Sequence, residues 1–293
     1  MMNTVQHAVS NVKNSFDFSV DKFRLSGPDN LRTPAFGLFR SDTMEFVGSG
    51  NNTFTDGYEP HTSDDVIALV EAASPLFDQN IEAKCHWNDG HYVFVEPNKG
   101  FRREIYNSRD SVWPRLVIRA GYNGRAFTAM MGLFRDACQN MSMPRKVSGT
   151  VTTIRHTHSL RDKMDRLISD FQKLNAAYDN LYDACQRMEA NKLRVSDFLT
   201  QVMGEIPSEE GSKRTRYENR VESIVNRLMR ERIELGRPDM ETGVASGWEL
   251  YNAVQGYVQH DKPRRGTPNR IDVILKTADD KMVRDAEILA LSL

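Results

Sequence analysis

The spacing of apolar residues changes near His158, and this change constrains the fold more than any other feature of the chain. Before that point, apolar and polar residues alternate in short runs bounded by turn residues, which is the pattern of β-hairpins. After it, apolar residues recur every three or four positions, as they do on one face of a helix. We therefore expect the α+β class, with a hairpin-rich antiparallel sheet domain over residues 1–157 and a helical domain over residues 158–293.

Extended segments separated by turn sequences predict three hairpins in the first half. They pair residues 36–40 with 44–47, residues 81–87 with 91–95, and residues 112–120 with 125–131. The second has the clearest turn, Asn88-Asp89-Gly90. A helix that begins near Thr62 and ends before Pro75 is expected between the first two hairpins, and a further strand is expected over residues 146–155.

A heptad-like stripe of apolar residues follows His158. Its members are spaced alternately three and four positions apart and are Met164, Leu167, Phe171, Leu174, Tyr178, Leu181, Cys185 and Met188. This spacing predicts one long helix, whose apolar face either joins the core of the helical domain or joins two copies of the chain. Shorter helices are expected over residues 196–203, 213–235, 247–260 and 279–291.

Composition is that of an ordinary folded protein. Charged residues make up 27% and hydrophobic residues 39% of the 293 positions, and no apolar run approaches the ~20 residues that cross a bilayer. The first residues lack the apolar core of a secretory signal, and the three cysteines are widely spaced without a CxxC pair. We therefore expect a cytoplasmic protein with reduced thiols, no membrane contact and no structural metal.

Charge is distributed unevenly along the chain, although the net charge is only −1. Residues 1–97 contain 6 basic and 14 acidic residues, residues 98–166 contain 14 and 5, and residues 167–293 contain 19 and 21. The middle segment, residues 98–166, is therefore a basic island. Any contact with a polyanion is expected there rather than over the whole chain.

The basic island combines arginines with aromatic residues. Arginines can contact phosphates while neighbouring rings stack on bases, which is how many proteins bind single-stranded nucleic acid. The residues expected to bind DNA are Arg102, Arg103, Arg115, Arg119, Arg125, Arg145, Lys146 and Arg155. Strand alternation places Arg115 and Arg119 on one charged face, opposite Leu116 and Ile118. The alternative is a solvated face that pairs with the acidic first segment, within one chain or between copies.

Other combinations of reactive residues give weaker signals. Glu82 and Lys84 lie on one strand face, where a carboxylate and a lysine would suit a metal-dependent nuclease, but such a pair also arises by chance. His156 and His158 could share a zinc ion, yet no third ligand follows from the spacing. No P-loop, dinucleotide-binding glycine motif or nucleophile elbow is present. We expect a protein that is not an enzyme and holds no cofactor, with the nuclease as a minor alternative.

Three segments carry a resemblance to a known family. They are Phe134-Arg-Asp-Ala-Cys-Gln-Asn-Met141, Ile154-Arg-His-Thr157, and Trp248-Glu-Leu-Tyr-Asn-Ala-Val254 with Tyr257, Val258 and His260. In this order they resemble the phage/plasmid-like proteins classed as a domain of unknown function, over nearly the whole chain. Family members usually have a Thr-Pro-Val-Arg-Val-like stretch before Cys-Gln-Asn, and this chain departs from it. The resemblance implies a phage or mobile-element origin and assigns no catalytic residue.

The side chains of these segments also have expected physical roles. We expect Cys138 to be a small buried residue, Asn140 to lie in a turn, and Asn252 to face a polar partner on the sheet or another helix. The order of hairpins, long helix and arginine-rich sheet is similar in topology to phage single-strand annealing proteins, without a shared motif. We therefore expect a phage-type protein that binds or anneals single-stranded DNA in replication or recombination as a homo-oligomer. A homo-oligomeric structural or host-interaction protein is the alternative.

Overall fold

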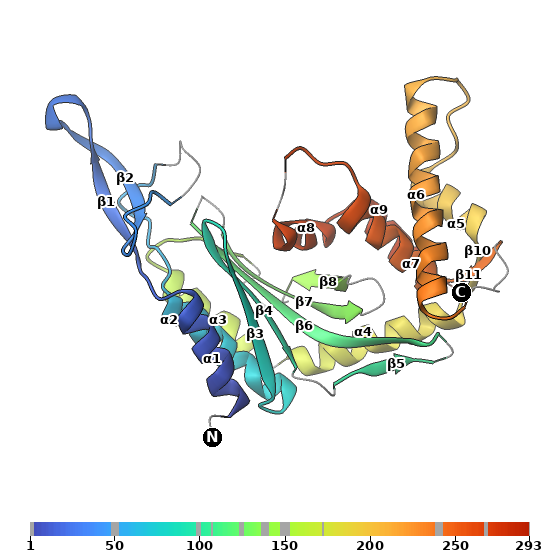
Figure 1. Cartoon of the computed structure of the whole chain (residues 1–293), viewed down its shortest axis with the longest axis horizontal. Helices are drawn as coiled ribbons and strands as arrows, with labels where there is room; N and C mark the ends of the chain where they lie inside the picture. The colour runs from blue at the N-terminus through green and yellow to red at the C-terminus, as the bar shows by residue number, and fades with distance from the viewer. Residues whose placement is uncertain are drawn as a thin grey trace. The chain divides into compact units, whose positions relative to one another are not determined.

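The computed structural model describes residues 3–47, 53–97, 101–106, 108–122, 126–135, 141–146, 153–171, 173–237, 243–266 and 269–292 (Figure 1). The predicted α+β class is confirmed, with antiparallel strands in the first half and helices in the second. The chain forms two compact units, and neither is a continuous segment. Unit 1 comprises residues 1–101, 115–131 and 145–175, and unit 2 comprises residues 102–114, 132–144 and 176–293. The expected boundary at residues 157 and 158 falls inside unit 1.

Seven strands form the main sheet. They are β3 (Ile81–Trp87), β4 (Gly90–Pro97), β5 (Arg103–Ile105), β6 (Asp110–Gly121), β7 (Phe127–Arg135), β8 (Met141–Lys146) and β9 (Thr153–Ile154). Their order is β3-β4-β6-β7-β8, with β5 paired to β6 and β9 paired to β7. The second and third predicted hairpins are confirmed, because β3 pairs with β4 and β6 lies beside β7. Of the strand expected over residues 146–155, Lys146 belongs to β8 and Thr153–Ile154 form β9, whereas residues 147–152 lie outside the described residues.

Unit 1 places helices against the β3–β4 hairpin. Its other elements are α1 (Thr4–Ser15), β1 (Val20–Ser26), β2 (Arg32–Arg40), α2 (Ser63–Ala73) and α3 (Leu160–Phe171), with short 3₁₀ turns at Pro28–Asn30 and Ser74–Phe77. Helix α1 packs on β3 and on α2 (Figure 1). The predicted helix near residue 62 is confirmed as α2, where Thr62 and Asp65 form a capping box. Helix α1 was not expected, since only Ala8 and Val12 on it are buried.

The first predicted hairpin is confirmed in part. Residues 36–40 belong to β2, whose partner along its length is β1, a pairing that was not expected. Residues 44–47 do turn back antiparallel on β2, through the Phe39–Phe46 bridge and the hydrogen bond from the Val47 N–H to the Leu38 carbonyl at 2.8 Å, but they form no continuous strand. Strand β1 is hard to recognise in the sequence because most of its side chains are exposed, so that its apolar residues do not form a clear buried stripe.

The heptad-like stripe is buried as expected, but it spans two helices. Helix α3 ends at Phe171 and α4 (Leu174–Ala190) begins three residues later, so the single long helix is wrong. All eight residues of the stripe are buried within one chain. The face is therefore core and is not free to join two copies, but only its second half belongs to the helical unit, because Met164, Leu167, Phe171 and Leu174 lie in unit 1.

Unit 2 is mainly helical. After α4 it contains β10 (Lys192–Arg194), α5 (Val195–Met203), α6 (Ser212–Glu234), β11 (Val244–Ser246), α7 (Gly247–Gly256), the π-helical turn η3 (Tyr257–Asp261), α8 (Arg270–Thr277) and α9 (Lys281–Leu291). The four shorter predicted helices are confirmed, and α8 was not expected. All ten residues of α7 are buried, and α7 packs on α6 and α9. A Cβ atom on Gly247 would lie only 2.6 Å from the carbonyl oxygen of Ala290, so this close approach requires glycine.

Side chains of α7 and η3 bind the backbone of β8. Tyr251 accepts a hydrogen bond from the N–H of Met143 at 2.9 Å, and Gln255 donates to the carbonyl of Met141 at 2.8 Å. Asn252 accepts one from the Ser142 hydroxyl at 2.7 Å, which confirms its expected polar partner. These side chains satisfy strand groups that would otherwise lack partners in a buried setting. Cys138 and Asn140 lie outside the described residues.

No helix within the described ranges is long and apolar enough to span a bilayer.

Candidate nucleic-acid interface

The eight residues expected to bind DNA are divided between the two units. Arg102 and Arg103 belong to unit 2, and both are exposed. Arg115, Arg119, Arg145, Lys146 and Arg155 belong to unit 1. Arg125 and the side chain of Lys146 lie outside the part of the chain that the structure describes. Each group is therefore considered within its own unit.

The expectation that Arg115 faces solvent is wrong. Its guanidinium donates from Nε to Glu96 at 2.9 Å and from Nη2 to the same oxygen at 2.5 Å, and both residues are buried. Lys84 pairs with the other oxygen of Glu96. Burial alone would raise the pKa of Glu96, but the two cations hold it below its ordinary value. Arg115 is thus committed to a structural ion pair on the sheet.

The other unit 1 residues are less enclosed. Arg119 is half-buried and donates to the hydroxyl of Thr128 at 3.3 Å, so it does not share a fully exposed face with Arg115. Arg145 is half-buried, and Arg155 is exposed. Strand alternation correctly puts Arg115 and Arg119 on one side of β6, but that side is largely covered rather than solvated.

The two residues of the nuclease alternative lie on β3. Lys84 is engaged by Glu96, and Glu82 lies directly opposite Glu96 in the β3–β4 register. Among the described residues, no group of three or more His, Cys, Asp or Glu side chains is arranged to hold a metal ion. His156 and His158 do not converge: His156 is buried and stacks on Tyr58, whereas exposed His158 pairs with Glu59.

A buried histidine pair in unit 1 was missed in the sequence. His61 Nε2 and His91 Nδ1 lie 2.7 Å apart, and each ring is only 1% exposed. Tyr122 stacks on His61 with a centroid distance of 4.1 Å. Burial, with lesser contributions from His91 and His156, places the pKa of His61 well below its ordinary value, and burial lowers that of His91 to about 3. Both rings are therefore neutral near pH 7, and one donates its N–H to the other.

An exposed cluster of arginine and aromatic side chains lies on β5 and the start of β6 in unit 2. The antiparallel register of Arg103 with Val112 continues to place Arg102 opposite Trp113. The guanidinium of Arg102 lies 4.9 Å from the centroid of the Trp113 ring, within cation–π range. Trp113 is half-buried and contacts the ring of Phe134 at 4.7 Å. We call Arg102, Arg103, Tyr106 and Trp113 the β5–β6 patch.

Helix α4 fixes the outer strand of this patch. Tyr182 and Gln186, one turn apart on α4, both donate to the carbonyl of Glu104, and the Gln186 side chain accepts from the N–H of Tyr106. Arg103 lies over Tyr182 at 5.2 Å and pairs with Asp179 at 2.6 Å. The Tyr106 side chain remains 71% exposed. The patch therefore presents an exposed ring and two guanidinium groups on a backbone that α4 holds in place.

A second basic surface of unit 2 was also missed. Lys213, Arg216 and Arg220 lie on the first half of α6, three and four positions apart, so they share one helix face. The acidic residues Glu218 and Glu222 fall on the opposite face, and Glu218 pairs there with Arg214. We call Lys213, Arg216 and Arg220 the α6 stripe. Counting charge over residues 167–293 as a block concealed it, because the block contains more acidic than basic residues.

The interior of unit 2 contains an arginine–carboxylate network. Arg135 pairs with Asp110 and with Glu231, and the indole N–H of Trp248 donates to the same Asp110 oxygen at 2.8 Å. Asp110, Arg135 and Glu231 are at most 4% exposed. The ion pairs and the indole hydrogen bond join residues of β6, β7, α6 and α7, so they hold strand and helix residues together.

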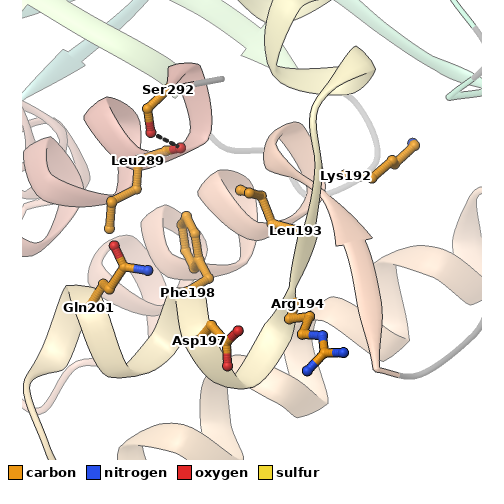
Figure 2. Close-up of a pocket in the computed structure, with 8 residues that line it drawn as sticks. All are labelled: Lys192, Leu193, Arg194, Asp197, Phe198, Gln201, Leu289 and Ser292. Atoms are coloured by element: carbon orange, nitrogen blue, oxygen red, sulfur yellow. Dashed lines mark hydrogen bonds between the residues drawn. The ribbon is translucent and has the colours of Figure 1, made fainter.

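A small pocket opens beside β10, α5 and the end of α9 (Figure 2). Its volume is about 230 Å³, below the ~300 Å³ at which small-molecule sites begin. Leu193, Phe198 and Leu289 give it an apolar wall, while Lys192 extends away from them and pairs with Glu189 at 3.3 Å. Its polar groups do not converge on one point, and we assign it no ligand.

Comparison with known proteins identifies the family but no function. No curated protein and no solved structure matches the chain. A protein-family model described as a domain of unknown function, DUF932, matches residues 52–284. This range contains the β5–β6 patch, the α6 stripe, the buried histidine pair and the arginine–carboxylate network. Helix α1 and the β1–β2 hairpin precede it. Because the match covers most of the chain, the protein belongs to the DUF932 family of domains of unknown function.

Proposed function

We propose that this protein binds single-stranded DNA through the β5–β6 patch of unit 2. The observation that carries the proposal is the exposed guanidinium of Arg102 placed over the half-buried ring of Trp113. An arginine held on an aromatic ring can contact a phosphate while the ring, or the exposed Tyr106 beside it, stacks on a base. Arg115, buried against Glu96, is not part of the proposed site.

The resemblance of the Cys-Gln-Asn and Leu-Tyr-Asn-Ala-Val segments to phage/plasmid-like proteins supports a role in the replication or recombination of a mobile element. Annealing of complementary strands is the finer form of this proposal. It requires that the protein hold a single strand with its bases accessible, which contacts to the backbone and stacking on one or two bases would permit.

Fluorescence anisotropy with labelled oligothymidine tests the proposal at about 50 and about 200 mM salt. The wild-type protein is expected to bind at the lower salt and to lose affinity at the higher salt. The double variant Arg102→Gln, Arg103→Gln is expected to bind about thirtyfold more weakly, because two phosphate contacts of roughly 1 kcal/mol each are lost. Stacking of a base on Trp113 should also quench the tryptophan fluorescence of the protein. Trp113→Phe keeps an apolar ring in place and is expected to abolish this part of the quenching.

The matched control is Lys192→Gln, Arg194→Gln, which removes the same charge from two positions on the exposed strand β10 of the same unit. It is expected to change the affinity for oligothymidine by less than twofold. Equal weakening by both double variants would mean that affinity depends only on the net charge of the protein, and it would contradict the β5–β6 site. No binding by the wild type at low salt would contradict the function itself, and light scattering would then test the homo-oligomeric alternative.

A further inference from the structure

The charges on the first half of α6 are sorted by face, and nothing within unit 2 explains the sorting. Lys213 and Arg216 are exposed and Arg220 is half-buried. None of the three pairs with an acidic residue that the structure describes, whereas Arg214 on the other face pairs with Glu218 at 2.9 Å. Arg216 donates only to the backbone and hydroxyl of Ser212. Three like charges on adjacent turns repel one another unless an anion is present.

The stripe continues the face by which α6 packs on the rest of the unit. Seven positions after Arg220, Arg227 lies on the same face and is buried, where it binds Asp261 of η3 through two hydrogen bonds of 2.9 Å. No residue of α6 before Ile224 is buried. The face that is covered in the second half of the helix is therefore uncovered in the first half, and there its side chains are cationic.

The segment after η3 adds positive charge near Arg227, on the helix face that continues from the stripe. Lys262, Arg264 and Arg265 follow Asp261, and Arg270 begins α8 and donates to His260 Nδ1 at 2.8 Å. Partial burial, Arg270, Arg227 and Arg264 together lower the pKa of His260 to about 4, even though Asp261 acts to raise it. Burial is the largest cause of this shift, and the three arginines near His260 add to it.

We propose that the α6 stripe, Lys213, Arg216 and Arg220, is a second nucleic-acid surface that binds the phosphate backbone of duplex DNA. The stripe is rigid and straight because its three residues lie on one α-helix. They span roughly 10 Å at 1.5 Å per residue. Helix α6 offers no ring for a base, because its single aromatic residue, Tyr217, is half-buried and donates to the Gly204 carbonyl at 3.0 Å. A cationic line without stacking favours the form with the denser phosphates, which is the duplex.

This surface is independent of the β5–β6 patch, which combines arginines with rings. A protein with both would hold a single strand by stacking at one place and a duplex by charge at another. The two contacts differ in chemistry, so they also differ in their response to salt. Duplex binding at the stripe should show a slope of log K against log salt of about −0.9 for each phosphate neutralised.

The experiment compares two triple variants of the full chain. One removes the stripe (Lys213→Gln, Arg216→Gln, Arg220→Gln), and the control removes three cations of unit 2 outside the stripe, half-buried Arg214 on the other face of α6 and exposed Lys281 and Arg284 on α9 (Arg214→Gln, Lys281→Gln, Arg284→Gln). Anisotropy is measured with a short labelled duplex and with oligothymidine. The stripe variant is expected to bind the duplex at least tenfold more weakly and to lose up to about 2.7 from the salt slope, whereas the control changes both by little.

Folding of each variant is checked by far-UV circular dichroism, and Lys213→Gln with Arg216→Gln, both at exposed positions, serves if the triple variant does not fold. Equal loss of duplex affinity in the stripe and control variants would overturn the proposal, as would a wild-type protein that binds oligothymidine but no duplex. The latter result would leave the proposed function standing. Duplex binding that depends on the stripe, with no binding of oligothymidine, would support this surface and contradict the β5–β6 site.

Discussion

Both units bury a polar cluster, but the cluster of unit 1 is neutral and that of unit 2 is charged. In unit 1 the buried cluster is His61 and His91, two neutral imidazoles that share one hydrogen bond. In unit 2 it is Arg135 with Asp110 and Glu231, one cation held between two carboxylates. A neutral pair tolerates the interior without a counter-ion, whereas a charged cluster is stable only while every member is present. The comparison therefore predicts that unit 1 is sensitive to pH and unit 2 to the loss of a partner.

The histidine pair is also incompletely satisfied. His61 Nδ1 and His91 Nε2 have no hydrogen-bond partner among the described residues. Because one ring donates its only proton to the other, one of these outer nitrogens carries a proton and the other a lone pair. In unit 2, Arg135 donates to two carboxylates and Asp110 also accepts from Trp248, but Glu231 Oε1 has no hydrogen-bond partner among the described residues.

Replacing Arg135 with methionine should produce the largest loss of stability. Methionine fills similar space but leaves Asp110 and Glu231 buried without their cation, which typically costs about 3–5 kcal/mol. Urea unfolding measures the change in free energy, and hydrogen exchange of α7 compared with that of the β3–β4 hairpin assigns the loss to unit 2. The same substitution at half-buried Arg214 removes the pair with Glu218 and is expected to cost at most about 0.5 kcal/mol. A loss below 1 kcal/mol for Arg135→Met would mean that water reaches the network.

Acidification should have the next largest effect, and it should act on unit 1. The folded-state pKa of His91, about 3, lies below the unfolded value of about 6.5, so the unfolded chain binds more protons between these values. Stability is complete above about pH 6.5 and falls on acidification by about 1.4 kcal/mol per pH unit for one proton, or roughly 2 kcal/mol at pH 5.

Unit 2 should lose stability only at a lower pH than unit 1. Burial alone would raise the pKa of Glu249, but its hydrogen bonds with Arg232 and with the Ser246 backbone hold it below its ordinary value. Its stabilising effect is therefore lost only as the pH falls below about 4.5. Hydrogen exchange at pH 7 and pH 5 should show that the β3–β4 hairpin loses protection while α7 keeps it. The double variant His61→Phe, His91→Leu should remove this difference, and a hairpin that is equally protected at both pH values would refute the prediction.

The features that the sequence predicted are local ones. The β3–β4 hairpin combines alternating side chains with an Asn-Asp-Gly turn, and α2 has its capping box within four residues. The buried stripe of α3 and α4 follows from spacing alone, but the break after Phe171 does not, because the period continues across it. The α6 stripe was visible in the same kind of spacing and was hidden only by counting charges along the chain instead of around the helix.

The features that could not be predicted depend on contacts between distant residues. Alternation places Arg115 on one side of β6, but only the pairing of β4 with β6 puts Glu96 against it. His61 and His91 are 30 positions apart and lie on a loop and a strand end, so neither carries a local signal. For the same reason, the partner of Asn252 was expected only as a type of group, and Ser142 emerges from the fold.

The smallest effect compares one buried tyrosine hydroxyl from each unit. In unit 2 the Tyr251 hydroxyl accepts from the backbone N–H of Met143, and in unit 1 the Tyr122 hydroxyl donates to the backbone carbonyl of His61 at 2.6 Å. Replacing either residue with phenylalanine leaves the ring in place and removes one hydrogen bond. A buried N–H without an acceptor is less tolerated than a carbonyl without one of its donors, because the carbonyl has two lone pairs and the N–H a single proton.

Tyr251→Phe should therefore cost about 1–2 kcal/mol and Tyr122→Phe about 0.5–1 kcal/mol. Urea unfolding gives both values, and Tyr182→Phe is the reference for a more accessible hydroxyl, which donates to the Glu104 carbonyl. The informative result is which of Tyr251→Phe and Tyr122→Phe lowers the free energy of unfolding more, because both tyrosines are equally buried. If Tyr122→Phe costs more, then the Tyr122 hydroxyl does more than satisfy one carbonyl: it positions the His61 ring stacked on it, and the histidine pair, rather than the α7–β8 contact, is the more strongly coupled polar cluster.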